Sequence, residues 1–178
     1  MYEQVLKFWF EETEPSQRFK KDEDFDRLIV ERFSDIHQQA VQCELFKWRA
    51  NAHGRLAEII VLDQFSRNMY RDTPLAFAYD PLALALAQEA VAAGADKTLS
   101  QQESSFLYMP YMHSESLPIH EVATELFSHN GTQNSLDYEH KHRAIIERFG
   151  RYPHRNTVLG RTSTPEELAF LEQPGSGF

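Results

Sequence analysis

The sequence contains almost no cysteine and no long apolar segment. A single cysteine, Cys43, among 178 residues excludes an intramolecular disulfide and a cysteine-rich zinc site. Cys43 falls in a helical pattern, so we expect a buried free thiol there. No apolar run approaches the roughly 18 residues that a membrane-spanning helix needs, and residues 1–12 lack the cationic start of a signal peptide. These absences predict a soluble, cytoplasmic protein.

Positive charge is also scarce. Eighteen Lys and Arg residues face 27 Asp and Glu residues, which gives a formal net charge of -9. Binding to nucleic acid or to an anionic membrane needs a basic surface, so we expect neither partner. The chain has no glycine-rich phosphate loop and no H-E-x-x-H pattern, and we expect no cofactor and no metal. The oligomeric state is left open.

Apolar residues recur at helical spacing nearly everywhere, as Phe25, Ile29 and Phe33 illustrate. Asp80-Pro81 reads as an N-cap and first turn of a helix over 81–93, and Ser100 with Glu103 reads as a capping box of a helix that ends before Pro110. The sequence therefore predicts an all-α protein of about seven or eight helices packed as antiparallel hairpins. We expect one domain over 1–178 with a short irregular C-terminal tail.

A short polar pattern occurs twice, in the middle of the chain and near its end. Each copy has an aromatic residue shortly before an Arg-Asn pair, Arg67-Asn68 and Arg155-Asn156, and each is followed by another arginine. The guanidinium group offers five N–H donors in a fixed fork that suits carboxylates and phosphates. Two such units predict one shared site for a small anionic ligand. The candidate ligand-binding residues are Asp63, Gln64, Arg67, Asn68, Tyr70, Arg71, Arg148, Arg151, Arg155 and Asn156.

Catalytic residues are harder to assign from the sequence. His113 and Glu115 lie at a junction between two helices, where an imidazole and a carboxylate suit proton transfer, and His154 lies within the second polar unit. We take these three residues as candidates for a reaction that the sequence does not identify. His142 falls on an apolar stripe with Ile145 and is expected to be a buried, structural histidine.

Two interpretations of the arginine-rich segments remain open. In the first, the arginines bind a ligand. In the second, they pair with acids on other helices, such as Asp63, Glu115 or Asp137, and the Arg-Asn units are internal clasps. The second interpretation fits a helical module that binds a peptide or protein partner in a groove.

Several strings resemble one family along almost the whole chain. They are VLKFWF at 5–10, LDQFSRNMYR at 62–71, LYMPYMHSES at 107–116, RFGRYPHRNTVLGR at 148–161 and STPEELAFL at 163–171. The family that they resemble is the bacterial domain of unknown function 924. Ser66 departs from it, because the family string usually has Pro there. The resemblance implies a TPR-like all-helical fold and no particular activity.

Overall fold

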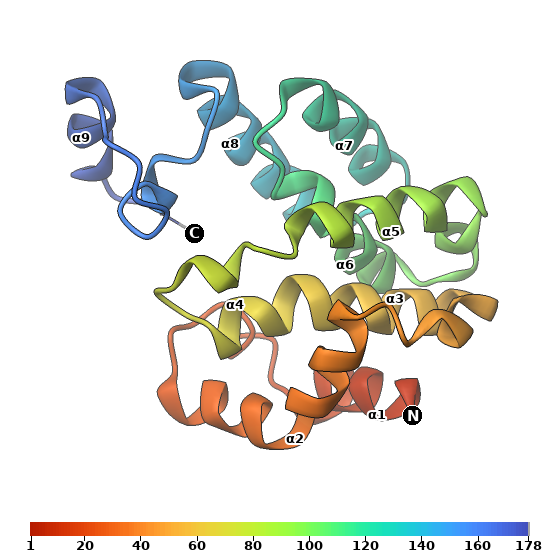
Figure 1. Cartoon of the computed structure of the whole chain (residues 1–178). Coiled ribbons are helices and arrows are strands. Elements are labelled where there is room, and N and C mark those ends of the chain that lie inside the picture. Colours follow the sequence, from red (N-terminus) through yellow and green to blue (C-terminus); the bar gives the residue numbers. More distant parts are fainter. Residues whose placement is uncertain (178) are drawn as a thin grey trace.

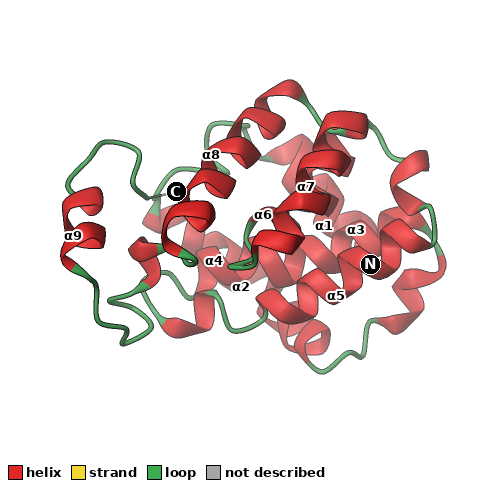
Figure 2. Cartoon of the chain, turned by 90° about the horizontal axis from the view of Figure 1, so that it is seen from above, coloured by secondary structure: helices red, strands yellow, loops and turns green. Residues whose placement is uncertain are grey.

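The structure is a computed structural model that describes residues 1–177, and no strand occurs in that range (Figures 1 and 2). The α-helices are α1 (Tyr2–Lys7), α2 (Glu23–Val41), α3 (Ala52–Ile60), α4 (Ser66–Met69), α5 (Asp80–Ala92), α6 (Gln101–Met112), α7 (Leu117–Asn130), α8 (Gln133–Phe149) and α9 (Pro165–Leu171). The expectation of an all-α fold is confirmed, while its TPR-like character stays a prediction. None of the described helices is long and apolar enough to cross a membrane.

Several helix ends follow the local sequence as expected. Ser100 and Glu103 form a reciprocal capping box at the start of α6, and Thr164 and Glu167 form another at the start of α9. At the C-terminal end of α8, Gly150 adopts the left-handed backbone with φ of 68°. That conformation costs glycine little, because it has no Cβ.

Three local expectations were wrong. Pro110 lies inside α6, which continues to Met112, because the last turn is packed between neighbouring helices and its residues are buried. Asp80 is the first residue of α5, and its carboxylate binds Arg67 instead of capping the helix. Cys43 is exposed, with φ of 58°, because α2 ends at Val41 and the chain turns there.

A long central helix carries both core and polar residues. α3 passes into a π-helical turn at Val61–Phe65 and then directly into α4, so the helix runs from Ala52 to Met69. Figure 1 shows this helix crossing the middle of the molecule, with α1 and α2 on one side and α5 and α6 on the other. π-helical turns inside α-helices occur frequently at functional sites. Here the turn contains Asp63, which is 1% exposed.

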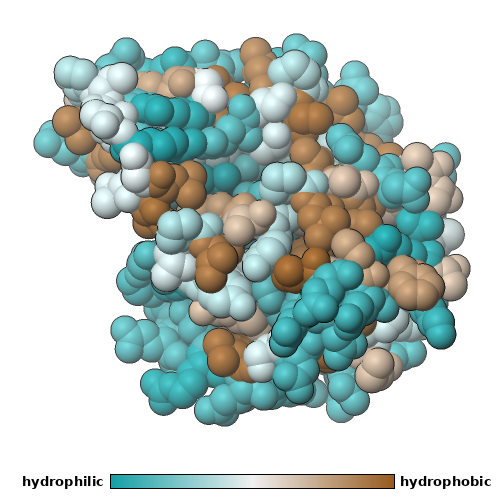
Figure 3. Space-filling view, viewed as in Figure 1, coloured by the Kyte–Doolittle hydropathy of each residue, from teal (hydrophilic) through white to brown (hydrophobic). Residues whose placement is uncertain are grey.

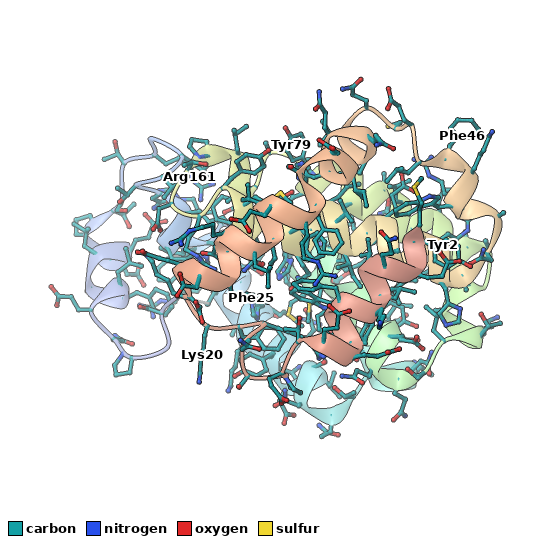
Figure 4. All side chains as sticks on the ribbon, turned by 90° about the horizontal axis from the view of Figure 1, so that it is seen from below. Tyr2, Lys20, Phe25, Phe46, Tyr79 and Arg161 are labelled. Carbon is teal, nitrogen blue, oxygen red and sulfur yellow. The ribbon has the colours of Figure 1, made fainter. Side chains whose placement is uncertain are left out.

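The main apolar core gathers around this central helix. Phe65 packs against Phe8, Trp9 and Phe33, with ring centroids 6.0, 5.6 and 4.9 Å away. Farther along the chain, α6, α7 and α8 pack on one another in sequence order, and a smaller apolar cluster surrounds Ile145. The view from below places Arg161 and Tyr2 towards opposite sides of the molecule (Figure 4).

Candidate functional site

A cleft of about 320 Å³ opens where three segments meet: the start of α5, the C-terminal end of α6, and the 3₁₀ turn Pro153–Arg155. Its apolar lining residues are Pro74, Phe77, Ala78, Pro81, Leu84, Pro110 and Leu159, and its polar ones are Asp80, His113, Ser114, Glu115 and Arg155. In the space-filling view the outline of the molecule is notched between the C-terminal helices and α4 (Figure 3). A mostly apolar cleft with a few polar groups is typical of sites for small molecules.

His113 lines the cleft and is fixed from behind by a buried carboxylate. Its Nδ1 lies 2.7 Å from Oδ1 of Asp63, which comes from the π-helical turn. Asp63 accepts further hydrogen bonds from Gln64 at 2.6 Å and from Arg67 at 3.1 Å. Burial raises the pKa of Asp63, but Arg67 and His113 lower it more, so the pKa falls well below its usual range. Asp63 is therefore ionised, and it orients the imidazole ring.

His113 itself remains neutral at neutral pH. Burial lowers the pKa of His113, the Arg67 guanidinium lowers it further, and the opposing effect of Asp63 is smaller. A neutral imidazole accepts a proton more readily than it donates one. His113 is therefore a weaker base than free imidazole, and its neutral ring keeps one nitrogen that can accept a hydrogen bond.

Asp80 joins the two arginines of the repeated pattern. Arg67 donates to both carboxylate oxygens of Asp80 at 2.9 Å, and Arg155 donates to one of them at 3.3 Å. Arg155 also donates to the backbone oxygen of His113 at 2.9 Å. Residues 67, 80, 113 and 155 thus form one connected polar cluster at the end of the cleft.

Arg155 is the least satisfied arginine of this cluster. It is 6% exposed, and its guanidinium carbon lies 4.5 Å from the ring centroid of Phe77 and 4.7 Å from that of Tyr152. Its Nε is buried without a hydrogen-bond partner among the described residues. Arg18 is equally buried at 7%, yet its Nε donates to the backbone oxygen of Trp9. Burial lowers the pKa of Arg155, Arg67 lowers it further, and Asp80 opposes them only in part.

Glu115 reaches the cleft, but its carboxylate is already engaged. Arg161 donates to its two oxygens at 2.7 and 2.9 Å, and the backbone N–H of Tyr152 donates at 2.7 Å. Burial raises the pKa of Glu115, and these bonds lower it more, to below its ordinary value. Glu115 therefore anchors the C-terminal segment against the end of α6.

The other predicted ligand residues lie away from the cleft. Asn68 and Arg71 both bind Asp26 on α2, at 2.6 to 2.8 Å. Arg148 pairs with the exposed Glu166, and Arg151 holds Glu167 with bonds of 2.7 and 2.8 Å. Residues 68, 71, 148 and 151 therefore connect segments of the fold.

Three further predicted residues also lie outside the cleft lining. Asn156 donates to Ser163 at 3.0 Å and accepts from Arg161 at 2.9 Å. The ring of Tyr70 lies 5.4 Å from that of His37. The ring of His154 packs at 5.6 Å from Tyr152, and burial, followed by Arg155, lowers the pKa of His154 to about 4.

Asp137, an expected partner of the arginines, instead accepts a hydrogen bond from Gln133.

The sequence did not reveal the residues that the start of α5 and the segment before it contribute to the cleft. The Asp80-Pro81 pattern indicates a helix cap and gives no reason to expect Asp80 between Arg67 and Arg155. Nothing in the sequence marks Phe77 as a site residue, because one aromatic residue before a helix is ordinary. The proximity of Arg67 to Asp63 four residues earlier was readable, and they do pair.

No set of three or more His, Cys, Asp or Glu side chains in residues 1–177 is arranged to hold a metal ion. The site is thus a cleft in an all-helical protein, lined by apolar groups and by an Arg–Asp–His cluster.

The chain belongs to the family described as bacterial protein of unknown function (DUF924), whose model matches residues 5–175. It is also similar to a solved structure titled protein of unknown function ATU0120 from Agrobacterium tumefaciens. The two are 39% identical, the similarity covers 96% of each chain, and the TM-score is 0.91. No curated protein matches the chain.

Proposed function

We propose that the protein binds a small molecule bearing a carboxylate or phosphate group in the cleft beside Arg155. The observation that carries this proposal is the incomplete pairing of a buried guanidinium group. Of the five N–H donors of an arginine, Asp80 and the backbone oxygen of His113 account for one each. Burying a charge is costly unless hydrogen bonds compensate it. A ligand oxyanion that accepts from the terminal N–H groups of Arg155 would supply part of that compensation.

The weak bond to Asp80 supports exchange with a ligand. At 3.3 Å it is longer than the two 2.9 Å bonds that Arg67 makes to the same carboxylate. If a ligand takes over Arg155, Asp80 keeps its two bonds to Arg67. The apolar wall formed by Phe77, Leu84 and Leu159 would contact the body of that ligand.

The test is calorimetric titration and thermal unfolding with acetate, benzoate, 3-phenylpropanoate and phosphate. Ligand binding to the folded state stabilises it by about 2.7 kcal/mol at one hundred times the dissociation constant. Sulfate serves as a reference for the general stabilisation by excluded salts. We expect at least one of these anions to exceed the sulfate effect.

Substitution separates a ligand site from an internal clasp. We expect Arg155→Met to stay folded and to lose the specific anion response. Arg151→Met is the matched control, because Arg151 pairs with Glu167 outside the cleft and its loss should leave the response intact. A wild type that never exceeds the sulfate effect, together with a strongly destabilised Arg155→Met, would instead support the clasp interpretation.

A second candidate function is a TPR-like helical module that binds a peptide or protein partner. It is favoured by the internal pairing of residues 68, 71, 148 and 151, which act as connections within the fold. On this alternative the cleft has no small-molecule ligand. The anion titration above distinguishes the two candidates, because a peptide-binding module gives no response that depends on Arg155.

A further inference from the structure

The ring orientation of His113 adds a second recognition element to the cleft. Because ionised Asp63 lies 2.7 Å from Nδ1, the ring proton resides on Nδ1. Nε2 then carries a lone pair and can only accept a hydrogen bond. Gln64 and Arg67 hold Asp63 in place, so the tautomer and the ring orientation are fixed together.

His113 and Arg155 are neighbours in the lining of the cleft. Arg155 donates to the backbone oxygen of His113 at 2.9 Å, and both residues line the cavity. A ligand that satisfies both must offer an oxyanion to the arginine and a hydrogen-bond donor to the histidine. A simple carboxylate has no such donor at neutral pH, and it would leave Nε2 facing its apolar body.

The apolar lining residues define the rest of the ligand. Phe77, Leu84 and Leu159 are apolar, and the adjacent Pro81 and Pro110 contribute no backbone N–H. An aliphatic or aromatic body fits these walls better than a second charged group.

From this arrangement we propose that the ligand is a hydroxycarboxylic acid with an apolar body, whose hydroxyl donates to Nε2 of His113 while its carboxylate binds Arg155. This inference rests on the proposed function and narrows it to one chemical class. The hydroxyl would form a neutral hydrogen bond to the imidazole. Such a bond contributes about 1 kcal/mol, and 1.4 kcal/mol corresponds to a tenfold change in affinity.

The decisive experiment compares matched ligands by calorimetry with the wild-type protein at pH 7.5. The ligands are 3-phenylpropanoate, its 2-hydroxy and 3-hydroxy derivatives, and the O-methyl ether of each. We expect one hydroxy acid to bind about five- to tenfold more tightly than the unsubstituted acid. Its methyl ether keeps the oxygen and loses the donor, so it should lose this advantage.

His113→Phe provides the protein side of the comparison, because it keeps a ring and removes the acceptor. The variant should bind 3-phenylpropanoate and the hydroxy acid with equal affinity. If it does not fold, the methyl ether comparison still decides the question in the wild type.

The outcomes separate the two proposals. If all the acids bind with equal affinity, the hydroxy-acid inference is overturned and the carboxylate site stands. If none of the acids binds, and acetate, benzoate and phosphate do not bind either, both proposals are overturned. If the His113→Phe variant prefers the hydroxy acid as strongly as the wild type does, another group accepts the hydrogen bond from the ligand hydroxyl. The role of His113 is then overturned.

Discussion

The two ends of the molecule are stabilised by different interactions. Around α1 to α3, large aromatic rings fill the interior, and Phe8, Trp9, Phe33 and Phe65 are each at most 2% exposed. In the C-terminal segment the apolar cluster is smaller, and charged or polar side chains are buried beside it, such as Glu139 at 0%. The first region is held mainly by apolar burial, the second by directional hydrogen bonds and ion pairs.

This difference explains why the candidate site lies where it does. Apolar packing is non-directional and offers no chemical groups to a ligand. Buried polar groups need hydrogen-bond partners, and a buried group whose hydrogen bonds are incomplete is available to a ligand. Arg155 and His113 are two of the polar residues that line the cleft. The comparison predicts that the two regions respond differently to substitution and to acid.

The largest effect is expected in the aromatic core. Phe65→Ala removes a ring that packs on three other aromatic residues, so we expect the free energy of unfolding to fall by about 3–5 kcal/mol. Phe46→Ala is the control, because Phe46 is 60% exposed and should change stability by less than about 0.5 kcal/mol. Urea unfolding measures both. A loss below 1 kcal/mol for Phe65→Ala would contradict the assignment of this region as the main core.

Acid should act on the polar region through buried histidine. Burial, with a smaller contribution from nearby His113, lowers the pKa of His142 to about 3. The unfolded chain takes up this proton near pH 6.5 and the folded chain only near pH 3, so acid favours unfolding between these values. One such histidine changes the free energy of unfolding by at most about 1.4 kcal/mol per pH unit. Its stabilising effect is complete above about pH 6.5.

His142→Leu tests this contribution by removing the ionisable group while filling the same apolar stripe. From about pH 6.5 to about pH 4 its free energy of unfolding, measured in urea, should fall less steeply than that of the wild type. The two slopes should differ by up to about 1.4 kcal/mol per pH unit. Equal slopes in the two proteins would show that His142 is not the neutral, buried group described above.

The sequence predicted the helices better than the site, for a physical reason. Helix ends depend on neighbouring residues, and the Ser100–Glu103 and Thr164–Glu167 boxes were readable because the two residues of each box are only three positions apart. The π-helical turn at Val61–Phe65 was not readable, because tertiary packing decides where a helix widens. Pro110 was misjudged for the same reason, since local rules disfavour a helix that the surrounding helices stabilise.

The site was only partly predictable because similar strings acquire different partners. Arg67 and Arg155 do meet, but through Asp80, whose role was hidden by its helix-capping pattern. Asn68 binds Asp26 on α2, whereas Asn156 binds Ser163 and Arg161 nearby. Which acid an arginine finds depends on packing over long sequence separations, and composition does not encode it.

The smallest effect concerns how α9 is attached. Glu167 is 2% exposed, accepts from Arg151 and from the N–H of Thr164, and completes the capping box of α9. The bond from Arg151 lowers the pKa of Glu167 to about 2, so its contribution is present above about pH 4.5 and is lost as the pH falls towards 2. We expect Glu167→Ala to cost about 1 kcal/mol at pH 7, the usual magnitude for a lost cap.

Hydrogen exchange at neutral pH locates this loss, because the amides of α9 should exchange faster while those of α3 stay protected. Glu166→Ala is the matched control, since the adjacent Glu166 is 65% exposed and pairs with Arg148 at the surface, where such pairs contribute little. If the two variants exchange alike, α9 is not held through Glu167. If α3 also loses protection in Glu167→Ala, the two regions unfold as one unit, and the contrast between an apolar and a polar end does not extend to local stability.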